Sequence, residues 1–147
     1  MRKETLSLEL VTTNLQGSNK HEIIESLVDI ICKSGKVKDR ELALQDLLQH
    51  ETEMSTGMEH GIAIPHAKSD SVDELVACVG ISRRKINFEC LDHKPAQIFV
   101  MTLSPKGSGG PHVRFLADIS QLLKDAKLRK KILKAKSDEE LLEILMS

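Results

Sequence analysis

Aromatic side chains are scarce in this chain. Its 147 residues include three Phe but no Trp and no Tyr. Proteins that bind single-stranded nucleic acid stack the bases on aromatic rings, and sugar-binding sites often use rings in the same way. Only Phe88, Phe99 and Phe115 could serve here. We therefore expect neither nucleic acid nor a sugar held on an aromatic platform.

Paired cysteines, excess charge of one sign and long apolar runs are missing too. Cys32, Cys78 and Cys90 are odd in number and lack CxxC spacing, so we expect buried free thiols and no disulfide framework. The 21 basic and 22 acidic residues leave a formal net charge of -1, which gives no overall attraction to nucleic acid or anionic membrane. No apolar run approaches the length of a membrane span, and the N-terminus does not resemble a signal peptide. The expectation is a cytoplasmic protein without direct membrane insertion.

Helix signals occur towards both ends of the chain. Asn19 with Glu22, and Ser137 with Glu140, form capping boxes, while Asp39 and Pro111 suit the starts of two further helices. Residues 127–134 have the pattern of a short basic helix with a solvated face. The helix that begins at Pro111 should turn its apolar residues inward, namely Val113, Leu116, Ile119, Leu122 and Leu123.

Strand signals lie between these helices. Residues 62–64, 75–82 and 97–103 are short apolar runs of strand type, residues 6–15 have the pattern of a strand or an extended arm, and residues 106–110 have that of a flexible connector. The order of helices, strands and helices around one core predicts a single-domain α/β sandwich with a mixed central β-sheet flanked by helices. The domain should span residues 1–147, with its core at about 5–146. The strand order stays open.

One histidine stands where a strand must end. The apolar run 62–64 stops at Pro65, which cannot donate to a sheet ladder. The chain should therefore leave the sheet there and present His66 at the rim of the domain. A neutral imidazole has a free nitrogen lone pair and is a competent nucleophile towards phosphorus. A lone histidine beside a proline is nevertheless more often an ordinary loop residue.

A second histidine follows Pro111 in the first turn of a predicted helix. The unpaired amides and positive dipole end of that turn favour an anion nearby and disfavour an imidazolium. His112 would then be a neutral hydrogen-bond donor, able to orient His66 or to hold a phosphoryl oxygen. The sequence does not show whether the two histidines meet.

Residues 55–68, which include S-T-G and then G-I-A-I-P-H-A-K, resemble the active-site segment of a known family. This family is the type-2 enzyme IIA domains of the bacterial phosphotransferase system, the fructose, mannitol and nitrogen-regulatory class. Three later segments resemble further sequence motifs of the family, in the same order. They are Leu91-Asp92 with Pro95, His112 to Ala117, and Lys136 to Leu141. The resemblance therefore extends over nearly the whole chain.

This resemblance implies a phosphocarrier. His66 would be the phosphorylated nucleophile, His112 its phosphate-stabilising neighbour, and His50, Thr56, Gly57 and Lys68 supporting residues. The donor would be the small carrier protein HPr, and the acceptor a cysteine of an enzyme IIB domain in sugar uptake. No cofactor is implied, because a phosphoramidate already has a high transfer potential. Two alternatives stay open: a nitrogen-regulatory module that signals by phosphorylation-dependent binding, and a degenerate binding domain that carries no phosphate.

Two positions depart from the family pattern. His50 stands where the family usually has an arginine before the glutamate matched by Glu51, and His93 replaces a turn glycine. Arginine is always charged and grips phosphate with two donors, whereas histidine is mostly neutral at cytosolic pH. Transfer could therefore be slower or more pH-dependent, or assisted by another cation such as Lys68.

A zinc site is the remaining chemical alternative. His60, His66, His93 and His112 with Cys90 could in principle surround a metal, and Cys90 and His93 have ligand-like spacing. No second closely spaced pair accompanies them, so we expect no metal site. The oligomeric state, the sugar and any regulatory target are left open by the sequence.

Overall fold

The computed structural model describes residues 6–107 and 109–147. The start of the predicted core at residue 5 and Ser108 of the predicted connector lie outside these residues. The helices are α1 (Lys20–Ile31), α2 (Arg40–Glu53), α3 (Gly110–Leu123), α4 (Ala126–Lys134) and α5 (Asp138–Met146), with two 3-10 turns, η1 (Leu8–Leu10) and η2 (Cys32–Ser34). The strands are β1 (Val11–Thr12), β2 (Ile62–Ala63), β3 (His66–Lys68), β4 (Val76–Ile86) and β5 (Ala96–Ser104).

The strands of the described residues form one mixed sheet, which confirms the predicted fold class. Its order is β1-β4-β5-β2, and β3 also pairs with β5. β4 and β5 are antiparallel, whereas β1 is parallel to β4, and β2 and β3 are parallel to β5. β2 and β3 therefore occupy successive stretches of the same edge of β5, and the short gap between them contains Pro65.

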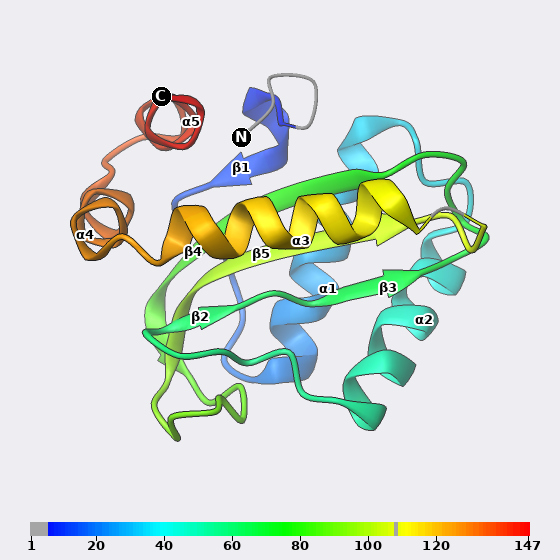
Figure 1. The fold of residues 1–147 in the computed structure, drawn as a ribbon, viewed down its shortest axis with the longest axis horizontal. Coiled ribbons are helices and arrows are strands. Elements are labelled where there is room, and N and C mark those ends of the chain that lie inside the picture. Colours follow the sequence, from blue (N-terminus) through cyan, green and yellow to red (C-terminus); the bar gives the residue numbers. More distant parts are fainter. Residues whose placement is uncertain (1–5, 108) are drawn as a thin grey trace.

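Helices cover both faces of this sheet. In Figure 1, α3 crosses in front of β4 and β5, α1 lies behind them, and α4 and α5 lie beside β1 at one end. α1 has apolar residues at helical spacing, and its inner side chains, such as Ile23, Leu27 and Ile31, are fully buried against the core. This packing holds the sheet in place from behind and leaves its β3 edge for α2 and α3 to frame.

The predicted helix starts are confirmed by their caps. The side chain of Asn19 accepts a hydrogen bond from the amide of Glu22, and those of Asp39 and Ser137 do the same for the amides three residues on. Each bond satisfies one of the amides that a helix start leaves without a partner. Pro111 lies in the first turn of α3, as expected.

Four details differ from the sequence predictions. The chain was expected to leave the sheet at Pro65, but it pairs with β5 again as β3, because β5 is long enough to offer Thr102 to Ser104 as partners. Residues 6–15 contain a 3-10 turn and only a two-residue strand, because β1 meets β4 over two residue pairs alone. β4 runs on to Ile86, past a register irregularity after Ile81. Val113 is 65% exposed, so its predicted inward position is wrong. The buried stripe of α3 follows the spacing of His112, Phe115 and Ile119, which turns Val113 towards solvent.

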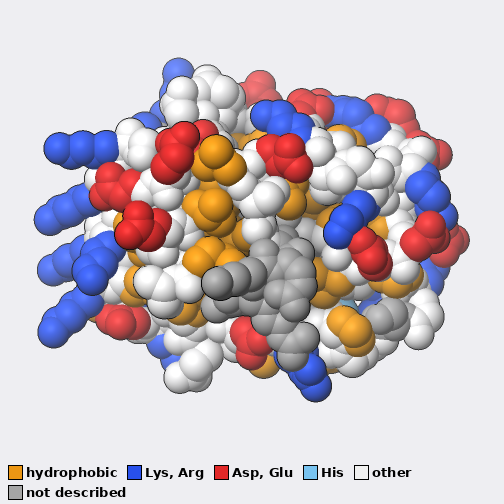
Figure 2. Space-filling view, turned by 90° about the horizontal axis from the view of Figure 1, so that it is seen from above, with side chains coloured by type: hydrophobic (Ala, Val, Ile, Leu, Met, Phe, Trp, Pro, Cys, Tyr) orange, Lys and Arg blue, Asp and Glu red, His pale blue; other side chains and the backbone are white. Residues whose placement is uncertain are grey.

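The lysines of α4 face solvent. Lys127, Lys130, Lys131 and Lys134 are exposed, while Ile132 is buried in the core. In Figure 2, basic side chains project from the end of the molecule where α4 lies. The helix is therefore an amphipathic surface element, as predicted. In the described part of the chain, no helix has both the length and the apolar character needed to cross a membrane.

Candidate functional site

His66 lies at a break in the edge of the sheet. β2 pairs with Ile98 and Phe99 of β5, and pairing resumes when His66 comes opposite Thr102. Pro65, between the two strands, has no amide hydrogen to offer the ladder, but its carbonyl accepts a hydrogen bond from the Thr102 amide at 3.1 Å. His66 is therefore the first residue of β3. Its backbone is held in the sheet, and the residue is half-buried.

The protonated nitrogen of His66 is set by a local hydrogen bond. Nδ1 lies 2.7 Å from the carbonyl oxygen of Ile64, two residues earlier. A carbonyl oxygen can only accept, so Nδ1 must carry the hydrogen. In the neutral ring the lone pair is then on Nε2. The hydrogen bond thus leaves one defined ring nitrogen, Nε2, with a free lone pair.

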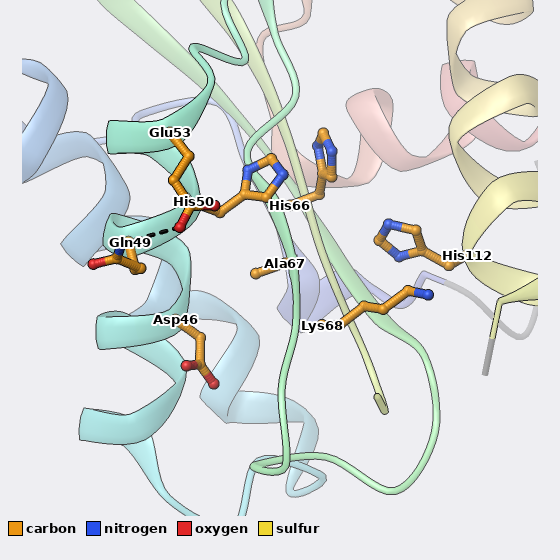
Figure 3. Close-up of a pocket in the computed structure, with 8 residues that line it drawn as sticks. All are labelled: Asp46, Gln49, His50, Glu53, His66, Ala67, Lys68 and His112. Carbon is orange, nitrogen blue, oxygen red and sulfur yellow. Dashed lines mark hydrogen bonds between the residues drawn. The ribbon is translucent and has the colours of Figure 1, made fainter. Parts of the chain in front are cut away.

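Two further histidines lie beside this ring. His50, in the last turn of α2, has its ring centroid 4.6 Å from that of His66, and His112, in the first turn of α3, has its centroid at 5.6 Å. The three histidines come from three elements and stand in a row across one pocket, with Lys68 beside His112 (Figure 3). The structure thus brings together the two histidines whose meeting the sequence could not show, and adds His50.

The pocket is open and has a volume of about 400 Å³. Its lining residues are Asp46, Gln49, His50, Glu53, His66, Ala67, Lys68 and His112. One oxygen of Asp46 and Nδ1 of His50 are buried without a hydrogen-bond partner among the described residues. The polar lining and the row of imidazoles suit a small, charged, hydrogen-bonding group.

Burial keeps the paired imidazoles neutral. The pKa of His66 is lowered from its ordinary value of 6.5, chiefly because burial disfavours the charged form, and the nearby His50 lowers it further. The pKa of His112 is also lowered, first by burial and then by the proximity of His66 and Lys68. Near neutral pH both rings are therefore mostly uncharged.

Thr56 and Gly57 support the site from outside the pocket. The Thr56 amide and hydroxyl donate to the two carboxylate oxygens of Glu51 at 2.8 and 2.6 Å, and Lys20 Nζ lies 2.7 Å from the same carboxylate. A Cβ at Gly57 would approach the Phe88 carbonyl oxygen to 2.6 Å, so only glycine fits there. This network ties α1, α2 and the segment before β2 together directly behind His50.

Sequence reasoning did not predict that Glu51 is buried and holds Thr56 and Lys20. Its side chain is buried, and it continues the inner face of α2 that Leu44 and Leu47 define. A charged residue at a core-facing helix position is the signal that could have revealed it, because a buried carboxylate needs partners. Ser104, which contacts His112, carried no sequence signal at all.

The zinc alternative finds no support in the geometry. Within residues 6–107 and 109–147, no three His, Cys, Asp or Glu side chains are arranged to hold a metal ion. His60, His93 and Cys90 do not line the pocket of His66 and His112.

Comparison with known proteins identifies the family. Residues 4–147 match the family model described as "Phosphoenolpyruvate-dependent sugar phosphotransferase system, EIIA 2", and the chain belongs to this family. It is a phosphotransferase component at the level of the family, and the resemblance seen in residues 55–68 is confirmed.

Three curated relatives illustrate the range of the family. The fructose-specific EIIA component of Haloferax volcanii is 36% identical over 94% of this chain and 90% of its own length. The fructose-specific EIIABC component of Bacillus subtilis is 32% identical over 97% of this chain, which corresponds to only 22% of that protein. A nitrogen regulatory protein of Bradyrhizobium diazoefficiens is 29% identical over 74% of this chain and 72% of its own length.

Solved structures share the fold at lower identity. Nitrogen regulatory protein IIA-Ntr from Neisseria meningitidis superimposes with a TM-score of 0.89 at 22% identity, covering 97% of both chains. The complex of enzyme IIAMTL and phosphorylated enzyme IIBMTL from Escherichia coli gives 0.82 at 19% identity, covering 96% of both chains. At these identities the likeness shows the fold alone.

Proposed function

We propose that this protein is a phosphocarrier in which His66 Nε2 accepts a phosphoryl group from a phosphorylated HPr-type protein and passes it to a cysteine of a IIB domain in sugar uptake. The observation that carries the proposal is the hydrogen bond from His66 Nδ1 to the Ile64 carbonyl. It assigns the lone pair to Nε2, in a pocket that also holds His50, His112 and Lys68.

The transfer step is a displacement at phosphorus. The Nε2 lone pair of His66 forms the new N–P bond while the N–P bond of the donor breaks, and the electron pair of that bond returns to the donor nitrogen. Nδ1 of His66 keeps its hydrogen and its hydrogen bond to the Ile64 carbonyl. The phosphorylated ring therefore carries a positive charge beside the phosphoryl anion. That charge keeps the phosphoryl group labile, ready for attack by a thiolate.

The neighbours of His66 supply stabilisation. Transfer of a phosphoryl group depends mainly on positioning and on donors aimed at its oxygens. His112 lies in the first turn of α3, where free amides favour an anion, and the ammonium of Lys68 adds a positive charge beside it. Both groups act on the phosphoryl oxygens from the side of the pocket opposite to His50.

Sugar uptake is favoured over nitrogen regulation by sequence similarity. The fructose-specific relatives are 32 to 36% identical to this chain, whereas the nitrogen regulatory protein is 29% identical over a shorter stretch. A IIB partner is supported by the similar solved structure from Escherichia coli, which is a complex of enzyme IIAMTL and phosphorylated enzyme IIBMTL. A cytoplasmic location follows from a donor that is a soluble carrier protein.

The first test is the intact mass of the protein after incubation with phosphoenolpyruvate, enzyme I and HPr. We expect a gain of one phosphoryl group that requires HPr, is lost in mild acid and is absent from His66→Ala. His21→Ala, which removes an exposed histidine of α1, is the matched control and should label fully. Full labelling of His66→Ala would refute the site, and a folded wild-type protein that takes up no phosphate would support the degenerate alternative.

A second test identifies the acceptor. The phosphorylated protein is mixed with a fructose-type IIB domain and with the same domain whose active-site cysteine is replaced by serine. Transfer to the first domain only, with loss of the phosphoryl mass from the carrier, is expected. A phosphoprotein that labels normally but passes nothing to IIB domains of the sugar transporters would favour the nitrogen-regulatory alternative.

A further inference from the structure

Ser104 joins the sheet to the second histidine of the pocket. It is the last residue of β5 and is fully buried, and its Oγ lies 2.8 Å from Nδ1 of His112. The same strand pairs with β3, which begins at His66, and Ser104 lies opposite Lys68 in this pairing. The contact therefore fixes the ring of His112 to the same strand that positions His66.

The direction of this hydrogen bond follows from what else the hydroxyl can reach. Among the described residues, Ser104 Oγ has no other hydrogen-bond partner. If the hydroxyl accepted a hydrogen from Nδ1, its own buried hydrogen would be left without an acceptor, which costs free energy. If it donates to Nδ1, the hydroxyl hydrogen has an acceptor, and the ring hydrogen of His112 is on Nε2. The second arrangement is therefore favoured.

We propose that Ser104 is a positioning residue that donates to Nδ1 of His112 and so holds His112 as the tautomer with its hydrogen on Nε2. The two neighbouring rings then have opposite polarity. Nε2 of His66 presents a lone pair, because the ring hydrogen is on Nδ1, where it is donated to the Ile64 carbonyl. Nε2 of His112, in contrast, presents an N–H. One ring attacks the phosphorus and the other donates to a phosphoryl oxygen.

The surroundings of His112 keep this tautomer relevant. A tautomer is defined only for the neutral ring, and the pKa of His112 is lowered by burial and by the charges of its neighbours. The opposite tautomer would aim a lone pair at the anionic oxygens and repel them. The catalytic consequence rests on the proposed phosphocarrier function, whereas the tautomer itself can be measured without it.

The direct test is the nitrogen-15 NMR spectrum of the histidine rings in the unphosphorylated protein at pH 7.5. His112 is assigned by the loss of its signals in His112→Gln. We expect Nδ1 of His112 to resonate as an unprotonated nitrogen and Nε2 as a protonated one. A protonated Nδ1 would overturn the proposal, and this readout holds whether or not the protein accepts phosphate.

Variants test the effect on transfer. Ser104→Ala should slow phosphorylation of His66 by about 3- to 10-fold, the rate change expected when one neutral hydrogen bond is lost. Ser104→Thr keeps a hydroxyl and should restore the rate and the NMR pattern. Ser82→Ala removes another fully buried serine hydroxyl, one bonded to the Arg84 carbonyl, and is the matched control for a purely structural loss. Equal slowing in Ser82→Ala, or an unchanged rate and tautomer in Ser104→Ala, would overturn the proposal. If the wild type accepts no phosphate, the phosphocarrier function fails while the NMR result still decides the role of Ser104.

Discussion

Replacing His50 with arginine should accelerate phosphorylation of His66 by about tenfold. The two rings are 4.6 Å apart, and one nitrogen of His50 is buried without a partner among the described residues. The side chain is therefore placed to donate to a phosphoryl group on His66 but has no fixed charge to offer. Arginine is charged at every pH of the assay and presents a fork of donors to phosphate.

The magnitude follows from the hydrogen bond that changes. A bond to a neutral donor is worth about 1 kcal/mol, and one that involves a charged donor about 1.5–3 kcal/mol. The difference of about 1.4 kcal/mol corresponds to a factor of about ten in rate. The pocket of about 400 Å³ is open enough to hold the longer side chain. Asp46, one turn earlier on α2, has a buried oxygen that can accept a hydrogen bond from one guanidinium nitrogen and so orient the others.

The assay is rapid quench of the reaction with phosphorylated HPr at pH 8, followed by intact mass. Arginine keeps its full charge at this pH. His21→Arg makes the same substitution at an exposed position of α1, where it keeps the contact with Glu25, and should leave the rate unchanged. An unchanged rate for a folded His50→Arg protein would show that no cation is limiting at this position and would refute the reasoning.

Three further outcomes are expected. The rate of labelling should be constant at neutral pH and begin to fall only below about pH 6.5, because attack needs neutral His66, whose pKa is lowered mainly by burial; a rate that rises on acidification would contradict this. The free energy of unfolding should fall as the pH drops from about 6.5 to the lowered pKa of the folded state, because in this window the unfolded chain binds the proton more readily. Lys20→Met should destabilise the protein by about 3 kcal/mol in urea unfolding, because it leaves the buried charge of Glu51 without its cation and with only the two hydrogen bonds from Thr56; a loss below about 0.5 kcal/mol would show that the ion pair behaves as an exposed one. Gly57→Ala should cost about 2 kcal/mol in the same assay, because the new Cβ meets the Phe88 carbonyl at 2.6 Å, and wild-type stability would mean that the backbone yields freely there.

Local signals predicted the framework of the fold well. Helix caps such as Asn19 act within three residues, and the sheet break at Pro65 follows from the chemistry of one residue, so both can be predicted along the chain. The prediction for Val113 failed because apolar character alone does not fix the face of a helix. His112 occupies the inner stripe of α3, and that assignment depends on what the helix packs against.

The sequence by itself predicted that a histidine follows a strand that ends at Pro65, and its resemblance to the enzyme IIA family implied that this histidine, His66, accepts the phosphoryl group. The grouping of His50, His66 and His112 was decided only by the tertiary structure, because α2 and α3 approach the β3 edge from separate parts of the chain. The tautomer of His112 was likewise decided there, because it depends on the hydroxyl of Ser104 at the end of β5, whereas that of His66 depends on the carbonyl of Ile64, only two residues away in the chain. Hydrogen bonding in a buried site follows distance in space, which the order of residues does not record.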